Sequence, residues 1–370
     1  MTTTVRPRTP AELAVLVPYQ LGYHPGPSVI LTVLSGRRLG LLQRHDLLTD
    51  PRDCRQAARR ALHIVAREEA TSLIVIAFEE DDGASAPLRA AVLAAAAELD
   101  LRIQEHVVVR GGRWYAPDCH DPCCPQEGLP LPRPEDVPAV AAFVHAGVAP
   151  LPSREALVGA VLPTHEGERA ERVAHHLEVL RALARGRGPV VERGEQLVQA
   201  WQCLLDPAPA APRVADLGDA VLARVALSLT DVPWRDALMS VLCPGAMSVS
   251  GPGDPQADLV RSATSRCPWA TGHPGPPSAA PGEAADAVLA VRARLVQLTA
   301  LVPEHLMPPV LTLVAHLAWW SGDGTVAAVC LERALAIDPD HRLAALMSDL
   351  LSCGVRPWSD PADPAAGEAA

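Results

Sequence analysis

The first 150 residues alternate between short apolar runs and amphipathic segments, a pattern that predicts strands separated by helices. The run 28–34 (SVILTVL) is β-branched, and a turn at 36–38 joins it to 39–47, which predicts an antiparallel hairpin. The run 73–78 (LIVIAF) is continuously apolar, as in a strand that is covered on both faces. A second hairpin is predicted at 102–110 and 113–116.

Capping signals mark the helices of this region. The residues TPAE at 9–12 form a capping box with proline in the first turn, and Gly22 is a stop signal. Asp50 followed by Pro51 is another helix start. Helices are therefore expected at 10–21, 51–69 and 87–99. The expected first domain, residues 1–150, is a mixed α/β sheet with antiparallel hairpins, flanked by helices.

From about residue 134 onward, helical periodicity replaces the strand pattern. Helices are predicted at 135–146, 153–160, 166–186, 190–205, 214–229, 233–242, 283–302, 307–321, 325–337 and 341–353. The segment 206–212 (DPAPAAP) is typical of a stiff connector, and the Pro/Gly-rich stretch 244–282 predicts a long irregular loop. We expect an all-α domain over 151–356 and a disordered tail at 357–370.

Near the C-terminus, small residues recur with the spacing of the second helix of a tetratricopeptide unit, where they allow a paired helix to approach closely. They are Gly322, Asp323, Ala327, Leu331, Ala334 and Pro339. The positions one repeat length earlier match poorly, and such repeats are stable only when stacked. A tetratricopeptide-like hairpin is therefore one interpretation, and ordinary helix packing is the one we favour.

Composition excludes several classes of chemistry. The chain has no lysine, so Schiff-base formation and a phosphate-loop lysine are excluded. A net charge of −11 argues against nucleic-acid binding over the whole surface. Arg52, Arg55 and Arg59 recur on one predicted helix face and could bind nucleic acid locally, although a solvated helix face is the simpler interpretation. No G-x-G-x-x-G, H-E-x-x-H or G-x-S-x-G motif is present.

Cysteine usage and hydropathy indicate the compartment. Nine cysteines scattered over 370 residues do not form the framework of a small secreted domain, so we expect reduced thiols. Residues 1–8 lack the apolar core of a secretory signal, and 306–320 is too short to span a membrane. We expect a cytoplasmic protein with no membrane contact.

The densest polar cluster of the sequence combines thiols and an imidazole at Cys119, His120, Cys123 and Cys124, flanked by Asp118, Asp121 and Glu127. Thiolate and imidazole are ligands for zinc or a softer ion. Against this, no second cysteine pair follows at finger-like distance, and adjacent Cys123 and Cys124 are not expected to chelate one ion together. A remote Cys267 or His273 would then be needed.

Two other interpretations of this loop stay open. Cys123 or Cys124 could be a catalytic thiol activated by His120 or His24. The loop could also be a proline-rich turn anchored by small buried thiols, which is the interpretation that the spacing alone favours.

A second candidate site follows the central strand, where the acidic run 79–82 (EEDD) lies at the carboxyl end of a strand. Alternate carboxylates there could hold Mg²⁺, and a solvated acidic loop is the simpler alternative. Residues that end or precede the other predicted strands could join them as a ligand-binding set. They are Tyr23, His24, Ser28, Arg44 and Asp46.

Several segments together resemble an uncharacterised actinobacterial family, domain of unknown function 4192. They are VPYQLGYHPGPSVILTVL (17–34), RHDL (44–47), CHDPCCPQEGLPL (119–131), LPSREAL (151–157), VPWRDAL (232–238) and AWWSGDGTVAAVCLERALAIDPDHRLA (318–344). They span nearly the whole chain in order. The resemblance implies no activity. It also implies that family members more often have an apolar residue at the position of His45.

Two functional hypotheses follow. The first is a non-catalytic binding or adaptor protein, with a site for a small ligand or a protein partner on the α/β domain. The second is a metal-assisted hydrolase or thiol-dependent enzyme, with its site between the sheet edge and the 118–127 loop. The second hypothesis requires His24, Asp46, Glu79 and Cys124 to converge in one pocket. Both take the segment near Tyr23 and the thiol loop to meet at the same rim of the sheet.

Overall fold

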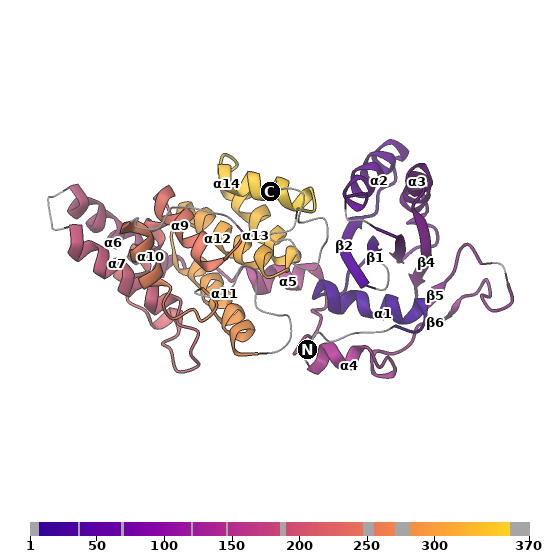
Figure 1. Cartoon of the computed structure of the whole chain (residues 1–370), viewed down its shortest axis with the longest axis horizontal. Coiled ribbons are helices and arrows are strands. Elements are labelled where there is room, and N and C mark those ends of the chain that lie inside the picture. The colour runs from indigo at the N-terminus through magenta and orange to yellow at the C-terminus, as the bar shows by residue number, and fades with distance from the viewer. Residues whose placement is uncertain are drawn as a thin grey trace. The chain divides into compact units, whose positions relative to one another are not determined.

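A computed structural model of the chain describes residues 7–35, 38–67, 70–119, 121–145, 147–185, 190–246, 255–270 and 282–355 (Figure 1). The chain divides into two compact units between Leu157 and Val158, an α/β unit and a helical unit. The expected tail, 357–370, lies outside the described residues.

The α/β unit is built on a six-stranded mixed sheet with the strand order β2-β1-β3-β4-β5-β6. The strands are β1 (Ser28–Ser35), β2 (Arg38–Asp46), β3 (Ser72–Glu79), β4 (Arg102–Arg110), β5 (Arg113–Tyr115) and β6 (Leu129–Pro130). Only β3 and β4 pair in parallel, and every other neighbouring pair is antiparallel. The mixed sheet and both predicted hairpins are confirmed, whereas β6 was not predicted because two residues carry no alternation pattern.

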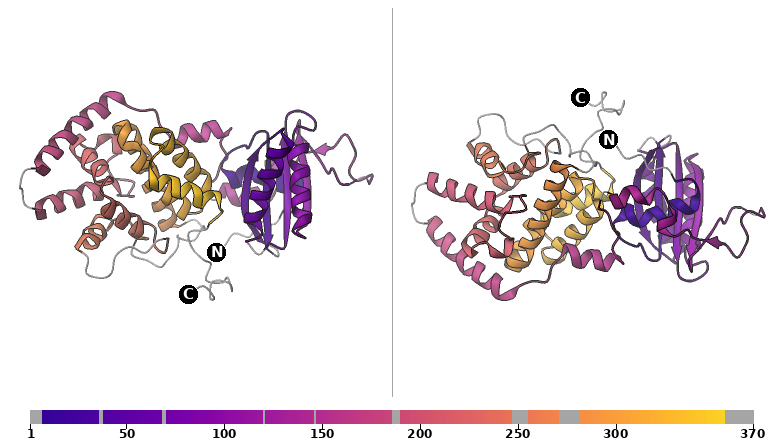
Figure 2. Two further views of the ribbon diagram at one scale, coloured as in Figure 1. Left: turned by 90° about the horizontal axis from the view of Figure 1, so that it is seen from above. Right: turned by 90° about the horizontal axis from the view of Figure 1, so that it is seen from below.

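Helices cover both faces of this sheet, as the views from above and below show (Figure 2). On one face lie α2 (Pro51–Val65) and α3 (Ala86–Glu98), which share a core with Val29, Leu31, Val75 and Ala77. On the other face α1 (Pro10–Leu21) contacts β4 and packs against α4 (Val140–His145). The continuously apolar β3 is buried on both sides, as its sequence predicts.

The capping signals begin the helices where they were expected. Thr9 Oγ1 accepts a hydrogen bond from the backbone N–H of Glu12 at 3.2 Å, and the Glu12 carboxylate accepts from the Arg8 N–H at 2.7 Å. Gly22 ends α1 in the left-handed region, with φ of 79°. Asp50 Oδ1 caps α2 by accepting from the first-turn backbone N–H groups.

The remaining helices that periodicity predicted, α4 of the α/β unit and those that follow it, are present with two differences at their starts. The predicted helix 135–146 is divided into a 3-10 turn (Pro134–Asp136) and α4, because Pro138 lacks an N–H and disfavours helical backbone at the preceding residue. Likewise, the predicted helix 214–229 begins with a 3-10 turn (Val214–Asp216) before α8. The helices are α5 (Arg154–Val161), α6 (Gly167–Arg185), α7 (Val190–Leu204), α8 (Asp219–Ser228), α9 (Val232–Leu242), α11 (Glu283–Leu301), α12 (Met307–Trp320), α13 (Gly324–Ile337) and α14 (Arg342–Ser352).

The prediction of an irregular loop throughout 244–282 was wrong, because the helix α10 (Pro255–Ala263) lies within it. Its buried residues Ala257, Val260 and Ala263 recur every three positions and form one apolar face. The surrounding proline and glycine residues concealed this short amphipathic segment. Residues 247–254 and 271–281 lie outside the described part of the chain.

The most buried helix of the helical unit is α12, which contacts α9, α11, α13 and α14. His316 lies inside it with 4% of its surface exposed, and its Nε2 has no hydrogen-bond partner among the described residues. Burial lowers the pKa of His316 to about 4, because an apolar environment disfavours the imidazolium. No helix in the described ranges is both long and apolar enough to cross a membrane.

This imidazole predicts acid sensitivity of the helical unit. The unfolded chain binds a proton at His316 below about pH 6.5, whereas the folded chain resists protonation until about pH 4. The folded chain is therefore not penalised at His316 above the unfolded pKa of about 6.5. As pH falls from there toward the folded pKa, its free energy of unfolding decreases by up to about 3 kcal/mol.

We expect His316→Leu to flatten the dependence of unfolding free energy on pH between 7 and 4, measured by urea titration with tryptophan fluorescence. The matched control is His63→Leu, which changes an exposed histidine of α2 and should keep the wild-type slope. Identical slopes for His316→Leu and the unmodified protein would contradict the assignment.

Candidate metal centre

The structure gathers three cysteine sulfurs in the loop that leaves β5 and returns as β6. The Sγ atoms of Cys119 and Cys123 lie 3.9 Å apart, and those of Cys123 and Cys124 lie 3.8 Å apart. All three sulfurs lie within 4.8 Å of one another, and none forms a disulfide. The sulfurs of adjacent Cys123 and Cys124 are thus close together, while the expectation that these two residues do not chelate one ion together stays a prediction. The fourth predicted ligand, His120, lies outside the described residues.

Successive backbone turns fold this loop so that its sulfurs meet. The N–H of Cys119 donates to Ala116 O at 3.1 Å, and the N–H of Cys124 donates to Asp121 O at 2.9 Å. A further turn closes between Pro125 O and the Gly128 N–H at 2.8 Å. Local backbone geometry therefore brings together residues whose spacing in sequence does not follow a zinc-finger pattern.

The sulfurs influence one another electrostatically. Hydrogen bonds from the backbone of Asp121 and from the thiol of Cys124 lower the pKa of Cys119. The hydrogen bond that Cys124 donates to Cys119 is in turn the main reason why the pKa of Cys124 rises to about 12. The proton of Cys124 is therefore held by its bond to Cys119, and a positive charge nearby would favour its loss.

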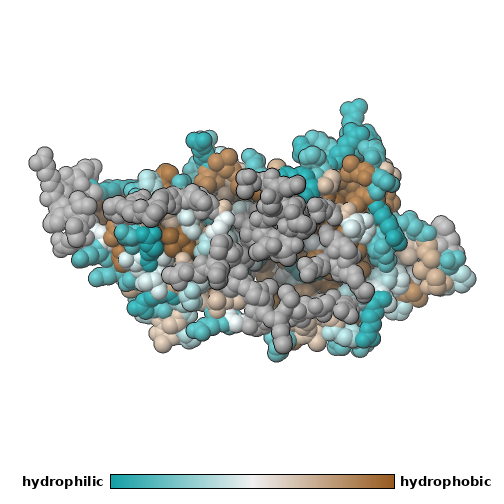
Figure 3. Space-filling view, viewed as in Figure 1, coloured by the Kyte–Doolittle hydropathy of each residue, from teal (hydrophilic) through white to brown (hydrophobic). Residues whose placement is uncertain are grey.

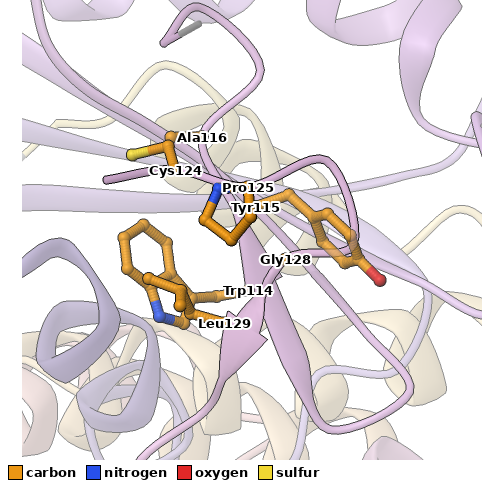
Figure 4. Close-up of a pocket in the computed structure, with 7 residues that line it drawn as sticks. All are labelled: Trp114, Tyr115, Ala116, Cys124, Pro125, Gly128 and Leu129. Atoms are coloured by element: carbon orange, nitrogen blue, oxygen red, sulfur yellow. The ribbon is translucent and has the colours of Figure 1, made fainter. Parts of the chain in front are cut away.

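The return of the loop passes very close to β5 and requires glycine at 128. Gly128 has φ of +71°, and a Cβ there would lie 2.7 Å from the Tyr115 ring and 2.9 Å from Trp114 O. A shallow hollow beside Cys124 is lined by residues of the segments 114–116, 124–125 and 128–129 (Figure 4). In space-filling form, hydrophilic and apolar residues intermingle on this projecting part of the α/β unit (Figure 3).

The predicted acidic site behaves differently from a ligand site. Glu79 is 7% exposed, and its Oε1 accepts from the Ser85 N–H at 2.8 Å and from the Ser85 hydroxyl. Its Oε2 accepts from Arg110 Nη1 at 3.0 Å and from the Gly83 N–H at 3.3 Å. Burial alone would raise the pKa of Glu79, but the hydrogen bonds from Ser85 and the charge of Arg89 outweigh it and lower that pKa. Both carboxylate oxygens are therefore used within the protein.

The other residues of the acidic run lie on the surface. Glu80 and Asp81 are exposed, and Asp82 pairs with Arg110. Arg52, Arg55 and Arg59, the local alternative for nucleic-acid binding, are all exposed on α2. This arrangement is that of a solvated surface.

A hydrogen-bonded chain that sequence reasoning missed continues from Ser85 to the thiol loop. Arg89 Nε donates to Ser85 Oγ at 2.6 Å, and Arg89 Nη1 lies 2.9 Å from His106 Nε2. His106 Nδ1 lies 2.8 Å from Oδ2 of Asp118, the residue before Cys119. Because a guanidinium only donates, Nε2 must accept and the proton must lie on Nδ1, which donates to Asp118. The only sequence signal was a histidine within the apolar strand β4.

The predicted ligand-binding set is partly assembled at the other side of the sheet. Arg44 Nη1 binds Asp46 at 2.7 Å, while Arg44 Nε and Nη2 donate to Pro25 O at 3.2 and 3.1 Å. Tyr23 is buried beside this pair, and burial, partly offset by the charge of Arg44, raises its pKa. Ser28 Oγ donates to Gly26 O at 3.0 Å. Arg44 and Asp46 thus pair with each other, and the other bonds of Arg44 and that of Ser28 go to backbone carbonyls.

His24 is not part of this cluster through its side chain. It is exposed, and its backbone N–H donates to Leu151 O at 2.9 Å. The neighbouring bridge between Tyr23 and Leu151 joins the start of the sheet to the end of the α/β unit. His45 Nε2 lies 3.1 Å from Gln43 Oε1, and burial lowers the pKa of this imidazole.

Strand register separates three of the four candidate catalytic residues, namely Asp46, Glu79 and Cys124. Ser28 pairs with both Asp46 and Phe78, so these three side chains share one face and Glu79, the next residue, lies on the other. Cys124 belongs to the loop after β5, which runs away from the end where β3 finishes. Asp46, Glu79 and Cys124 therefore lie in three different surroundings.

The same topology overturns the premise that the segment near Tyr23 and the thiol loop meet at one rim. Tyr23 precedes β1 at the end where β3 finishes, whereas the loop leaves β5 at its opposite end, with β3 and β4 between. The proposed remote ligand Cys267 is buried in the helical unit, where its Sγ contacts Leu205 O at 3.8 Å. The other remote candidate, His273, lies outside the described residues.

Comparison with known proteins agrees with the resemblance seen in the sequence. No curated protein and no solved structure matches the chain. The pattern of one protein family, described as domain of unknown function (DUF4192), matches residues 10–358. This match covers both the α/β unit with its thiol loop and the helical unit, and the chain therefore belongs to the DUF4192 family.

Proposed function

We propose that this chain is a non-catalytic metal-binding protein whose α/β unit holds a zinc-like ion on Cys119, Cys123 and Cys124. The spacing of the sulfurs carries the proposal. A tetrahedral ion with sulfur ligands at 2.3 Å places neighbouring sulfurs about 3.8 Å apart. Two of the Sγ separations in the loop are 3.8 and 3.9 Å, and all three sulfurs lie within 4.8 Å of one another.

The donor chemistry narrows the class of ion. Thiolates prefer zinc, cadmium and monovalent copper, whereas magnesium and calcium require oxygen ligands. The ion would also supply the positive charge that lets Cys124 lose its proton beside Cys119. His120 or water would complete a tetrahedral set. Thiols of this kind stay reduced in the cytoplasm, which is where we place the protein.

A binding role is preferred to catalysis because the candidate catalytic groups are kept apart. Asp46 is engaged with Arg44, and Glu79 is saturated by Ser85, Gly83 and Arg110. Neither carboxylate is directed at the thiol loop. The enzyme hypothesis that joined these two carboxylates to Cys124 as a metal-assisted hydrolase or thiol-dependent enzyme is therefore less favoured than a binding role.

The first test measures binding directly. The reduced, metal-free protein should bind about one equivalent of zinc or cadmium, with a sulfur-to-cadmium charge-transfer band in the ultraviolet. The variant in which Cys119, Cys123 and Cys124 are all serine should lose that band. The matched control replaces the exposed Cys203 and Cys353 with serine and should bind like the unmodified protein. Equal binding by both variants would reject the site.

The second test uses the tight return of the loop. Gly128→Ala should weaken cadmium affinity by about tenfold or more, because its Cβ would displace Tyr115 and with it the loop. Gly111→Ala is the matched control, since Gly111 also has positive φ, +56°, but open space around its Cβ. Both variants share a left-handed backbone strain of about 1 kcal/mol, and Gly128→Ala adds the clash with Tyr115 and Trp114, so it should also unfold more readily. An affinity loss common to both would show that strain, not the loop contact, is responsible.

A further inference from the structure

We propose that His106 is a positioning residue that holds the thiol loop in its metal-binding shape before an ion arrives. This inference rests on the proposed metal-binding function. His106 lies on β4, and its Nδ1 donates to Asp118, the residue that leads into Cys119, at 2.8 Å. The imidazole is fixed by the sheet, while the carboxylate that it holds belongs to the loop.

The loop is held at both of its ends. At the upstream end the bond is that from His106 to Asp118. At the downstream end Arg113 of β5 donates from Nε to Glu127 O at 2.7 Å and from Nη2 to Gly128 O at 2.6 Å. The sulfurs lie between these two attachments, so the sheet limits how far they can separate.

The upstream attachment is rigid because His106 is buried and is held by other side chains that are buried or half-buried. The His106 side chain is 4% exposed, whereas that of Asp118 is 67% exposed. Arg89 donates to His106 Nε2, and Ser85 and Glu79 in turn fix Arg89. This arrangement leaves the imidazole one tautomer, with its only N–H directed at the loop.

Preorganisation of this kind raises affinity because ordering a loop costs conformational free energy. When the upstream attachment is lost, that cost must be met during ion binding. Partners that orient metal-site segments are typically worth about 10- to 100-fold in affinity.

Two substitutions at His106 separate its two hydrogen bonds. The side-chain nitrogen of Asn lies as many bonds from Cβ as Nδ1 does, so His106→Asn keeps a donor toward Asp118. The nitrogen of Gln lies as far out as Nε2, so His106→Gln keeps a polar group toward Arg89 and loses the bond to Asp118. Both variants keep an amide side chain at this buried position, and each loses one of the two hydrogen bonds.

The experiment titrates cadmium into reduced, full-length protein in competition with a chelator, beside thermal unfolding of each metal-free variant. We expect His106→Gln to bind about tenfold more weakly and His106→Asn to bind within about twofold of the unmodified protein. A residue that served only stability would lower the unfolding temperature in both variants without separating their affinities.

The outcomes distinguish the two proposals. If the unmodified protein binds no cadmium, the metal-binding function itself fails. If it binds and His106→Gln binds equally well, the positioning role is overturned while the function stands. If the His106 variants do not fold, Asp118→Ala and Asp118→Asn decide, because Asp118 is exposed and Asn keeps an acceptor oxygen for His106. Equal affinity of that pair would also overturn the positioning role.

Discussion

A buried carboxylate at the end of β3 organises the polar half of the α/β unit. An unpaired charge in that place would be strongly unfavourable, and Glu79 is stable there because Ser85, Gly83 and Arg110 saturate both of its oxygens. These bonds join the end of β3 to the start of α3 and to the end of β4. The parallel pair at the centre of the sheet is thereby locked to the helix that connects its two strands.

A series of side-chain hydrogen bonds connects Glu79 to the surface. Ser85 and Arg89 of α3 orient His106, and His106 reaches Asp118 at the start of the thiol loop. A buried hydrogen-bond network thus positions a surface loop whose cysteines are exposed or half-buried. This explains how a projecting segment brings three sulfurs together without a disulfide.

Periodicity predicted the fold well wherever an element is long enough to display a pattern. The strand β3 and the helices α1, α12 and α13 have the type and nearly the bounds that their residues indicate. The errors occur where the pattern is short or interrupted. The two-residue β6 exists only because Gly128 returns the chain beside β5, and α10 is a nine-residue helix enclosed by proline- and glycine-rich segments.

By itself the sequence determined the strands, the helices and the presence of sulfur donors at Cys119, Cys123 and Cys124. It did not determine which groups meet. Strand register sends Asp46 and Glu79 to opposite faces, and the bond from His106 to Asp118 crosses from a strand to a loop. Side-chain periodicity is a property of neighbours along the chain, whereas these contacts depend on pairing and turn geometry in three dimensions. Only the tertiary structure could therefore separate the candidate catalytic residues and bring the sulfurs together.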